Sequence, residues 1–343
     1  MKIAFVGKGG SGKTTLSALL CRHLAARGHP VLAIDADINQ HLGAALGGAG
    51  GEEATAPPMG EHLDVIKDYL RGSNPRIPSA GMMVKTTPPG PGSRLLRTGD
   101  DNPLWERFGV DVDGVRLLAT GAFTEDDLGV ACFHSKLGAV ELLLNHLVDG
   151  AGEYVVVDMT AGADAFASGL FTRFDHTFLV CEPTRKAVAV HDQYREYAAD
   201  YEITVSAVGN KISDDSDVAF LREHLGADLR ACFRHCPPVR ALEQGRPFHL
   251  DDLDPETRSS LATLQGLVDR TVRDPERFVA QMHEIHRRNA RAWANRSAGT
   301  DLTTQIDPAY RPPYPPVPEP RTTPTRTHAT FPAPPAPYTH LRA

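Results

Sequence analysis

The stretch FVGKGGSGKTTL, residues 5 to 16, joins an apolar run to a helical pattern through a glycine-rich turn. Within it, GKGGSGKT (Gly7 to Thr14) satisfies the spacing G-x-x-x-x-G-K-[ST] of a phosphate-binding loop. Glycines let successive backbone N–H groups converge on phosphate oxygens, and the following helix adds the positive end of its dipole. We therefore expect Lys13 to contact the β- and γ-phosphates of a nucleotide and the Thr14 hydroxyl to ligate Mg²⁺.

Short apolar runs rich in β-branched residues alternate with helical patterns along the chain. Six strong runs lie at 2–7, 31–37, 114–121, 154–160, 176–183 and 203–211, and a weaker one lies at 229–235. Near-continuous apolar strands separated by helices are typical of a parallel sheet that is covered on both faces. The sequence therefore predicts an α/β fold, a doubly wound and mainly parallel sheet with helices on both faces.

The proline content divides the chain into a domain and its appendages. We expect the phosphate-loop domain at 1–252 with a mobile insertion at 48–110, a helical extension at 253–297 and a disordered proline-rich tail at 298–343. The tail has almost no apolar periodicity, so it cannot bury enough surface to offset its ordering entropy.

The overall composition excludes several classes of protein. Apolar residues make up 41% of the 343 residues, which is enough for a sizeable core. The net charge of −7 gives no electrostatic case for general binding to nucleic acid or to an anionic membrane. Five cysteines, with no secretory pattern at the N-terminus, fit a reduced, cytoplasmic protein. No run of about 18 apolar residues occurs, so we expect no transmembrane helix.

A second lysine in the turn, Lys8, is not required by the phosphate-loop pattern. The stretch KGGSGKTT resembles the deviant Walker A motif of the MinD, ParA, arsenite-pump ATPase and nitrogenase iron protein superclass. The resemblance implies ATP hydrolysis of low turnover, and a Lys8 that crosses an ATP-dependent homodimer interface to the partner's nucleotide. The alternative for Lys8 is a solvated loop lysine. The nucleotide-binding residues that the resemblance implies in the turn are Gly9, Gly10, Ser11, Gly12, Lys13, Thr14 and Thr15.

Aspartates end two of the expected strands. DAD at 35–37 ends the second run, and VVVDMTAGAD at 155–164 overlaps the fourth. At the carboxyl edge of a parallel sheet, such carboxylates face the ligand crevice. The resemblance implies that Asp37 positions the attacking water and that Asp35 and Asp158 support Mg²⁺. The alternative for each aspartate is a cap or turn residue at the end of a strand.

The segment GNKIS, 209–213, decides the expected base. It resembles the N-K-x-D element of guanine-specific GTPases, but Ser213 stands where the aspartate would be. Without that carboxylate, the guanine N1–H and amino group lose their acceptors, and unpaired base edges are costly. The superclass pattern then places Asn210 on an adenine and Lys211 below its ring, so we expect ATP.

The segment from 129 to 147, GVACFHSKLGAVELLLNHL, resembles the part of CooC-like carbon-monoxide dehydrogenase accessory ATPases that carries a cysteine pair at the dimer interface. Here the pair is Cys132 and His134, which are ligand types for Zn²⁺ or Ni²⁺. The resemblance implies a shared metal site and an unidentified client protein, for which a metalloenzyme is one candidate. The alternative is a buried cysteine beside a surface histidine. For Cys232 and Cys236, packing is the expected role.

The opposing function is a MinD- or ParA-like positioning ATPase that binds a membrane, DNA or a protein partner. The segment 276–296 carries arginines beside Trp293, which suits either an interfacial helix or a helix docked on the domain. The sequence leaves both alternatives open.

Overall fold

The structure is a computed structural model that describes residues 1–47, 54–122, 133–162, 166, 168–246 and 248–314. Within these residues one sheet has the strand order β3-β4-β2-β5-β1-β6-β7-β8. The strands are β1 (Lys2–Gly7), β2 (Val31–Ala36), β3 (Val110–Val112), β4 (Val115–Ala119), β5 (Tyr154–Met159), β6 (His176–Cys181), β7 (Val205–Ile212) and β8 (Leu229–Arg234). Neighbouring strands are parallel except β3 and β4. The predicted α/β fold is confirmed, and only the short antiparallel β3 was not expected.

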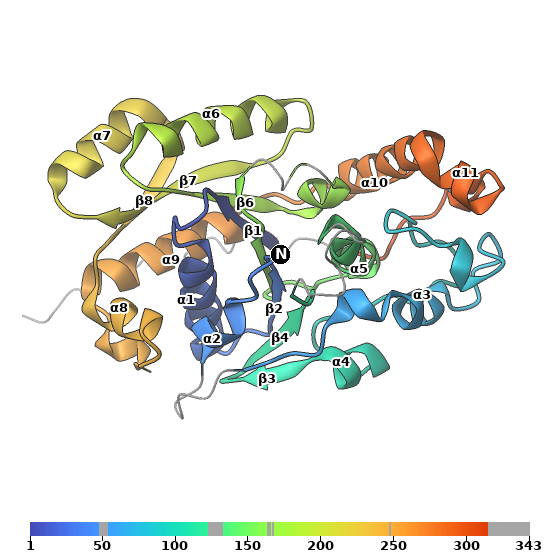
Figure 1. The fold of residues 1–343 in the computed structure, drawn as a ribbon, viewed down its shortest axis with the longest axis horizontal. Helices are drawn as coiled ribbons and strands as arrows, with labels where there is room; N and C mark the ends of the chain where they lie inside the picture. Colours follow the sequence, from blue (N-terminus) through green and yellow to red (C-terminus); the bar gives the residue numbers. More distant parts are fainter. Residues whose placement is uncertain (48–53, 123–132, 163–165, 167, 247, 315–343) are drawn as a thin grey trace, which may run out of the picture.

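Helices cover both faces of the sheet (Figure 1). One layer contains α1 (Lys13–Ala26) and α9 (Pro255–Arg270), and the other contains α5 (Phe133–His146), α6 (Arg185–Ala199) and α7 (Asp215–Leu225). Strand β1 packs against both layers of helices. Ile3 and Phe5 lie in the core formed with α1, and Ala4 and Val6 lie in the core formed with α5. Since both faces are buried, both alternating sets of side chains are apolar.

The segment between β2 and β3 is packed against the domain. It contains α2 (Leu42–Leu46), α3 (Leu63–Arg71) and α4 (Pro103–Phe108). Ile66, Leu70 and Trp105 are buried in the same core as α5. Apolar side chains between the prolines therefore hold the described part of 48–110 in place, which differs from the mobile insertion that we expected. Residues 48–53 lie outside the described residues.

The helical extension also docks on the domain. Helix α10 (Pro275–Asn289) continues through a π-helical turn, Ala290–Ala294, into α11 (Asn295–Ala298). Phe278, Val279 and Met282 are buried, whereas Trp293 is 48% exposed. Of the two alternatives for 276–296, the structure therefore shows the docked helix. Among the described residues, no helix is long and apolar enough to cross a membrane.

Packed chain continues beyond the expected start of the tail at residue 298. Leu302 and Ile306 are buried, and the Gln305 side chain accepts a 2.9 Å hydrogen bond from the Thr87 hydroxyl. His286 of α10 holds the same segment through the carbonyl of Leu302, at 3.0 Å. Leu302 and Ile306 precede the part of the tail in which prolines dominate, and their burial fixes this segment on the domain.

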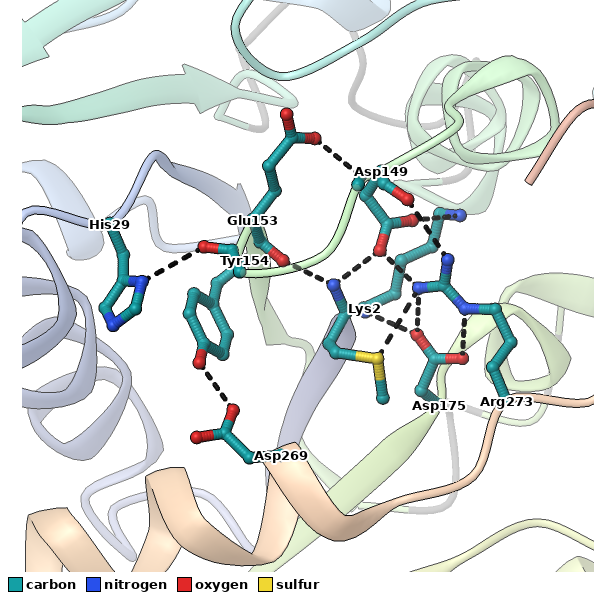
Figure 2. Close-up of polar contacts among 11 residues, drawn as sticks. Lys2, His29, Asp149, Glu153, Tyr154, Asp175, Asp269 and Arg273 are labelled. Atoms are coloured by element: carbon teal, nitrogen blue, oxygen red, sulfur yellow. Dashed lines mark hydrogen bonds and ion pairs between the residues drawn. The ribbon is translucent and has the colours of Figure 1, made fainter. Parts of the chain in front are cut away.

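A buried ion network anchors the extension to the sheet, as Figure 2 shows. Arg273, between α9 and α10, donates two hydrogen bonds to Asp175, at 3.0 and 2.7 Å, and it also contacts Asp149. Lys2 pairs with Asp149 at 2.9 Å. Burial opposes the charge of Asp149, but Lys2 and Arg273 outweigh it and hold the pKa of that carboxyl well below its usual value. The network lies at the start of β1, opposite the glycine-rich turn.

Candidate nucleotide-binding site

The glycine-rich turn lies between the end of β1 and the start of α1, at the carboxyl edge of the sheet. Gly7 leaves β1 with φ 145°, and Gly12 precedes α1 with φ 94°. A Cβ on Gly7 would lie 2.6 Å from the Val180 carbonyl oxygen, and one on Gly12 would lie 2.1 Å from Nδ2 of Asn210. Both positions require glycine for their backbone conformation, and at Gly7 the neighbouring backbone carbonyl also leaves no space for a side chain.

A cleft of about 540 Å³ opens over this turn. Its lining includes the predicted residues Gly9, Gly10, Gly12, Lys13, Thr14, Thr15, Asp37 and Lys211, together with Asn39, His41, Ala161 and Glu243. Ser11 is buried behind the turn, and its backbone N–H donates to the Lys8 carbonyl at 3.1 Å. Lys8 itself is partly exposed. Because the structure holds one chain, the predicted contact of Lys8 with a partner's nucleotide stays a prediction.

Thr14 and Asp158 connect the turn to β5. The Thr14 hydroxyl donates a 2.6 Å hydrogen bond to Oδ2 of Asp158. Oδ1 of this fully buried carboxyl has no hydrogen-bond partner among the described residues. Burial and the nearby charge of Asp35 raise the pKa of Asp158 to about 8. A buried, under-bonded carboxyl beside a hydroxyl offers the hard oxygen ligands that Mg²⁺ prefers.

Asp35 lies beside Asp158, because β2 and β5 pair these two residues in register. Its carboxylate accepts hydrogen bonds from the backbone N–H groups of Leu42, at 2.8 Å, and Asp37, at 3.2 Å. Burial raises the pKa of Asp35 to about 7. Asp35 therefore orders the turn after β2, and it also brings a second carboxyl to the same place as Asp158.

Asp37 is the cleft-lining member of the DAD segment. Its Oδ1 accepts hydrogen bonds from the backbone and side-chain nitrogens of Asn39, both at 3.0 Å. The side chain is largely buried, yet it lines the same cleft as Lys13 and Thr14. This position agrees with a role near the phosphates, while the water-positioning role stays a prediction.

The donor set fits Mg²⁺ better than a transition metal. Among the described residues, no group of three or more His, Cys, Asp or Glu side chains has the arrangement of a metal site. Mg²⁺ is usually bound by one or two carboxylates together with substrate phosphates and water. The Thr14 hydroxyl, with Asp158 and Asp35 behind it, matches that pattern.

A second cleft, of about 690 Å³, adjoins the first on the side of β7 and β8. Its lining includes Asn210, Lys211, Phe233, His235, Cys236, Pro237 and Val239, and it shares Thr15, Lys211 and Glu243 with the first cleft. Asn210 donates from Nδ2 to the Ser11 carbonyl at 2.8 Å. Lys211 donates to the Gly10 carbonyl at 2.6 Å and pairs with Glu182 at 2.9 Å. Both predicted base-site residues thus hold the glycine-rich turn.

The candidate transition-metal residues fall at the limit of the described chain. Cys132 lies outside the described residues, and so does the side chain of His134, whose backbone belongs to the first turn of α5. Burial raises the pKa of the Cys232 and Cys236 thiols. Protonated thiols are poor metal ligands, so this environment favours the packing role that we expected for both.

Comparison with known proteins places the fold and the turn in one family. The profile of the CobQ/CobB/MinD/ParA nucleotide-binding domain matches residues 3–309. The chain belongs to this family. The carbon monoxide dehydrogenase accessory protein CooC of Rhodospirillum rubrum is 30% identical over 273 residues, which cover 79% of this chain and 97% of that protein. An uncharacterised ATP-binding protein of Methanocaldococcus jannaschii is 29% identical over 256 residues, covering 73% and 92%.

Solved structures of the CobQ/CobB/MinD/ParA family show the same fold. A chain of the MinC:MinD cell division protein complex from Aquifex aeolicus superposes with a TM-score of 0.52 at 21% identity, covering 80% of this chain and 97% of that chain. The predicted resemblance to MinD/ParA-class ATPases and to CooC is therefore confirmed. The shared domain is a nucleotide-binding one, which agrees with the two clefts around the turn.

Sequence reasoning missed two carboxylates of the site. Glu182 follows β6 and pairs with Lys211, while Glu243 ends α8 (Pro237–Glu243) and contacts Thr15. Glu182 lies in the stretch CEPTRKAV, residues 181–188, directly after the apolar run of β6. Its partner becomes visible only once β6 and β7 are known to be neighbours.

Proposed function

We propose that this protein is an ATP-hydrolysing homodimeric switch that acts in the maturation of a metalloenzyme in the cytoplasm. The observation that carries the nucleotide part is the hydrogen bond between Thr14, which lines a glycine-rich cleft, and the buried Asp158. The similarity to an accessory protein of carbon monoxide dehydrogenase supports the maturation part.

Each residue of the cleft has a separate task in this proposal. Lys13 binds the β- and γ-phosphates, and Asp37 orients the attacking water. Lys8 reaches the nucleotide of the partner subunit and adds positive charge where negative charge develops. Thr14, Asp35 and Asp158 would hold Mg²⁺, which neutralises phosphate charge when bound. Asn210 and Lys211 take the adenine side, next to the larger cleft.

The cargo site is proposed at the start of α5. Cys132 and His134 from each of two subunits supply four ligands to one Zn²⁺ or Ni²⁺ ion, which is the number that a closed tetrahedral site needs. ATP favours the closed dimer, so by linkage the bound metal must favour ATP binding to the same degree.

Metal content of the purified dimer tests this proposal. We expect one Zn²⁺ or Ni²⁺ per two chains with a non-hydrolysable ATP analogue, and less without it. Cys132→Ser and His134→Ala should each lower the metal content, whereas Cys232→Ser, the matched control, should keep it. One ion per single chain, or metal retained in the double variant, would place the site elsewhere.

The competing function, a MinD- or ParA-like positioning ATPase, is separated by a second measurement. Co-sedimentation with anionic liposomes or DNA should show no ATP-dependent binding. ATP-dependent co-sedimentation, together with an absence of bound metal, would favour the positioning ATPase instead.

A further inference from the structure

Glu243 lies between the two parts of the nucleotide site. It is the last residue of α8, and it lines both the phosphate-side cleft and the larger cleft beside it. Its Oε1 accepts a 3.2 Å hydrogen bond from the hydroxyl of Thr15. The carboxylate therefore contacts the glycine-rich turn from a helix that is 228 residues away in the sequence.

Local structure gives no reason for a carboxylate at this position. The C-terminal end of a helix carries partial negative charge, so an acidic residue there is unfavourable. In the described part of the chain, no lysine, arginine or histidine forms an ion pair with Glu243. The side chain is exposed, so packing does not require it either. The hydrogen bond with Thr15 is therefore the interaction that the position of Glu243 makes possible.

Thr15 lies in the first turn of α1, where backbone N–H groups and the helix dipole attract phosphate. A threonine hydroxyl has one proton to donate. While Thr15 donates it to Glu243, that proton is not available to a phosphate oxygen. A phosphate at this turn would also place its negative charge close to the carboxylate, and the two would repel each other.

We propose that Glu243 competes with nucleotide phosphate for Thr15 and thereby weakens nucleotide binding and speeds product release. The inference rests on the nucleotide site proposed above. In the empty site Glu243 holds the Thr15 hydroxyl from α8. When phosphate binds, the carboxylate loses this contact and moves away, and it returns as ADP leaves. Glu243 is thus a positioning residue that acts through Thr15.

Calorimetric titration with ADP and with adenosine tests the inference, because adenosine occupies the base side without phosphate. We expect Glu243→Gln and Glu243→Ala to bind ADP about two- to fivefold more tightly than the unmodified chain, as for an exposed charge contact. Adenosine affinity should not change. Raising the salt concentration should shrink the difference for ADP, since exposed charges are screened.

Two further variants make the result specific. Glu223→Gln removes another exposed carboxylate, on α7, and should leave ADP affinity unchanged. In a Thr15→Val background, most of the gain from Glu243→Ala should disappear, because the contested hydroxyl is gone.

Unchanged or weaker ADP binding in both Glu243 variants would overturn the inference. An equal gain in affinity for adenosine would also overturn the inference, because Glu243 would then act on the base and not on the phosphates. A failure of the unmodified chain to bind ADP would be a different result, because it would overturn the nucleotide site itself.

Discussion

The hydroxyl of Thr14 and the carboxyl of Asp158 are joined by a 2.6 Å hydrogen bond, although 144 residues separate them in the sequence. The bond joins the start of α1 to β5 at the centre of the sheet. It leaves Oδ1 of Asp158 buried without a partner among the described residues. A cation that replaces the missing partner would also favour the ionised carboxyl, which makes metal binding depend on pH.

Binding of ADP with Mg²⁺ should tighten as the pH rises between about 7 and 8.5. The pKa of Asp158 is raised to about 8 and that of Asp35 to about 7. In the proposed Mg²⁺ site both carboxyls act in their ionised form. In EDTA the trend should reverse, because ionised Asp158 then only adds negative charge near the phosphates. Calorimetry with and without Mg²⁺ measures both slopes. Asp158→Asn should remove most of the difference, and equal slopes in both conditions would contradict this interpretation.

Lys8→Ala should bind a non-hydrolysable ATP analogue as a single subunit but fail to dimerise. The reason is that Lys8 is partly exposed at the start of the turn and so can reach a partner subunit, whereas Lys13 is largely buried in the lining of the cleft of its own chain. Size-exclusion chromatography with light scattering decides between monomer and dimer. Lys186→Ala, an exposed lysine on α6, is the control and should dimerise normally. A fully dimeric Lys8→Ala protein would show that the lysine is only solvated.

Asp37→Ala should lower kcat by about a hundredfold or more while changing nucleotide affinity little. A carboxylate that orients water acts mainly in the transition state, so its loss removes few ground-state contacts. Steady-state ATPase assays and analogue titrations separate the two effects. Asp101→Ala, at an exposed position, serves as the control. If affinity falls while turnover survives, Asp37 is instead a magnesium or folding residue.

Arg273→Ala should lower the free energy of unfolding by about 3–5 kcal/mol at neutral pH, because it leaves buried Asp175 and Asp149 short of a cation. Urea denaturation measures this difference, and exposed Arg270→Ala should change it little. The pKa of Asp149 is depressed, so its ion pairs stabilise the fold fully above the usual aspartate pKa, about 3.9, and this stabilisation is lost as the pH falls further. A loss below about 1 kcal/mol would mean that the network is not needed for stability.

Local features of this protein could be predicted from the sequence because their causes are local. The turn needs glycine at Gly7 and Gly12 for positive φ, and these glycines, with Lys13 and Thr14, are consecutive or nearly so in the chain. Strands buried on both faces show as continuous apolar runs. The parallel fold, the nucleotide-binding turn and the family were therefore within reach of sequence reasoning.

The packing of the appendages depended on distant partners and was decided by the tertiary structure. Prolines suggested a mobile 48–110 segment and a tail from 298, yet Ile66 and Leu302 are buried against the domain. The composition of a segment indicates how much conformational entropy is lost when it becomes ordered. The burial of apolar surface that offsets this loss depends on surfaces elsewhere in the chain.

The candidate site likewise has features that the sequence predicts and features that only the tertiary structure decides. Asp35, Asp37 and Asp158 were recognisable as strand-end carboxylates, but the raised pKa values of Asp35 and Asp158 are set by burial and by neighbouring groups. Glu182 and Glu243 had no local signal, because their contacts with Lys211 and Thr15 come from β6 beside β7 and from α8 beside the turn. The sequence by itself identified the candidate nucleotide-binding residues, because most of them are neighbours in the chain, and the order of strands and helices decided which carboxylates surround them.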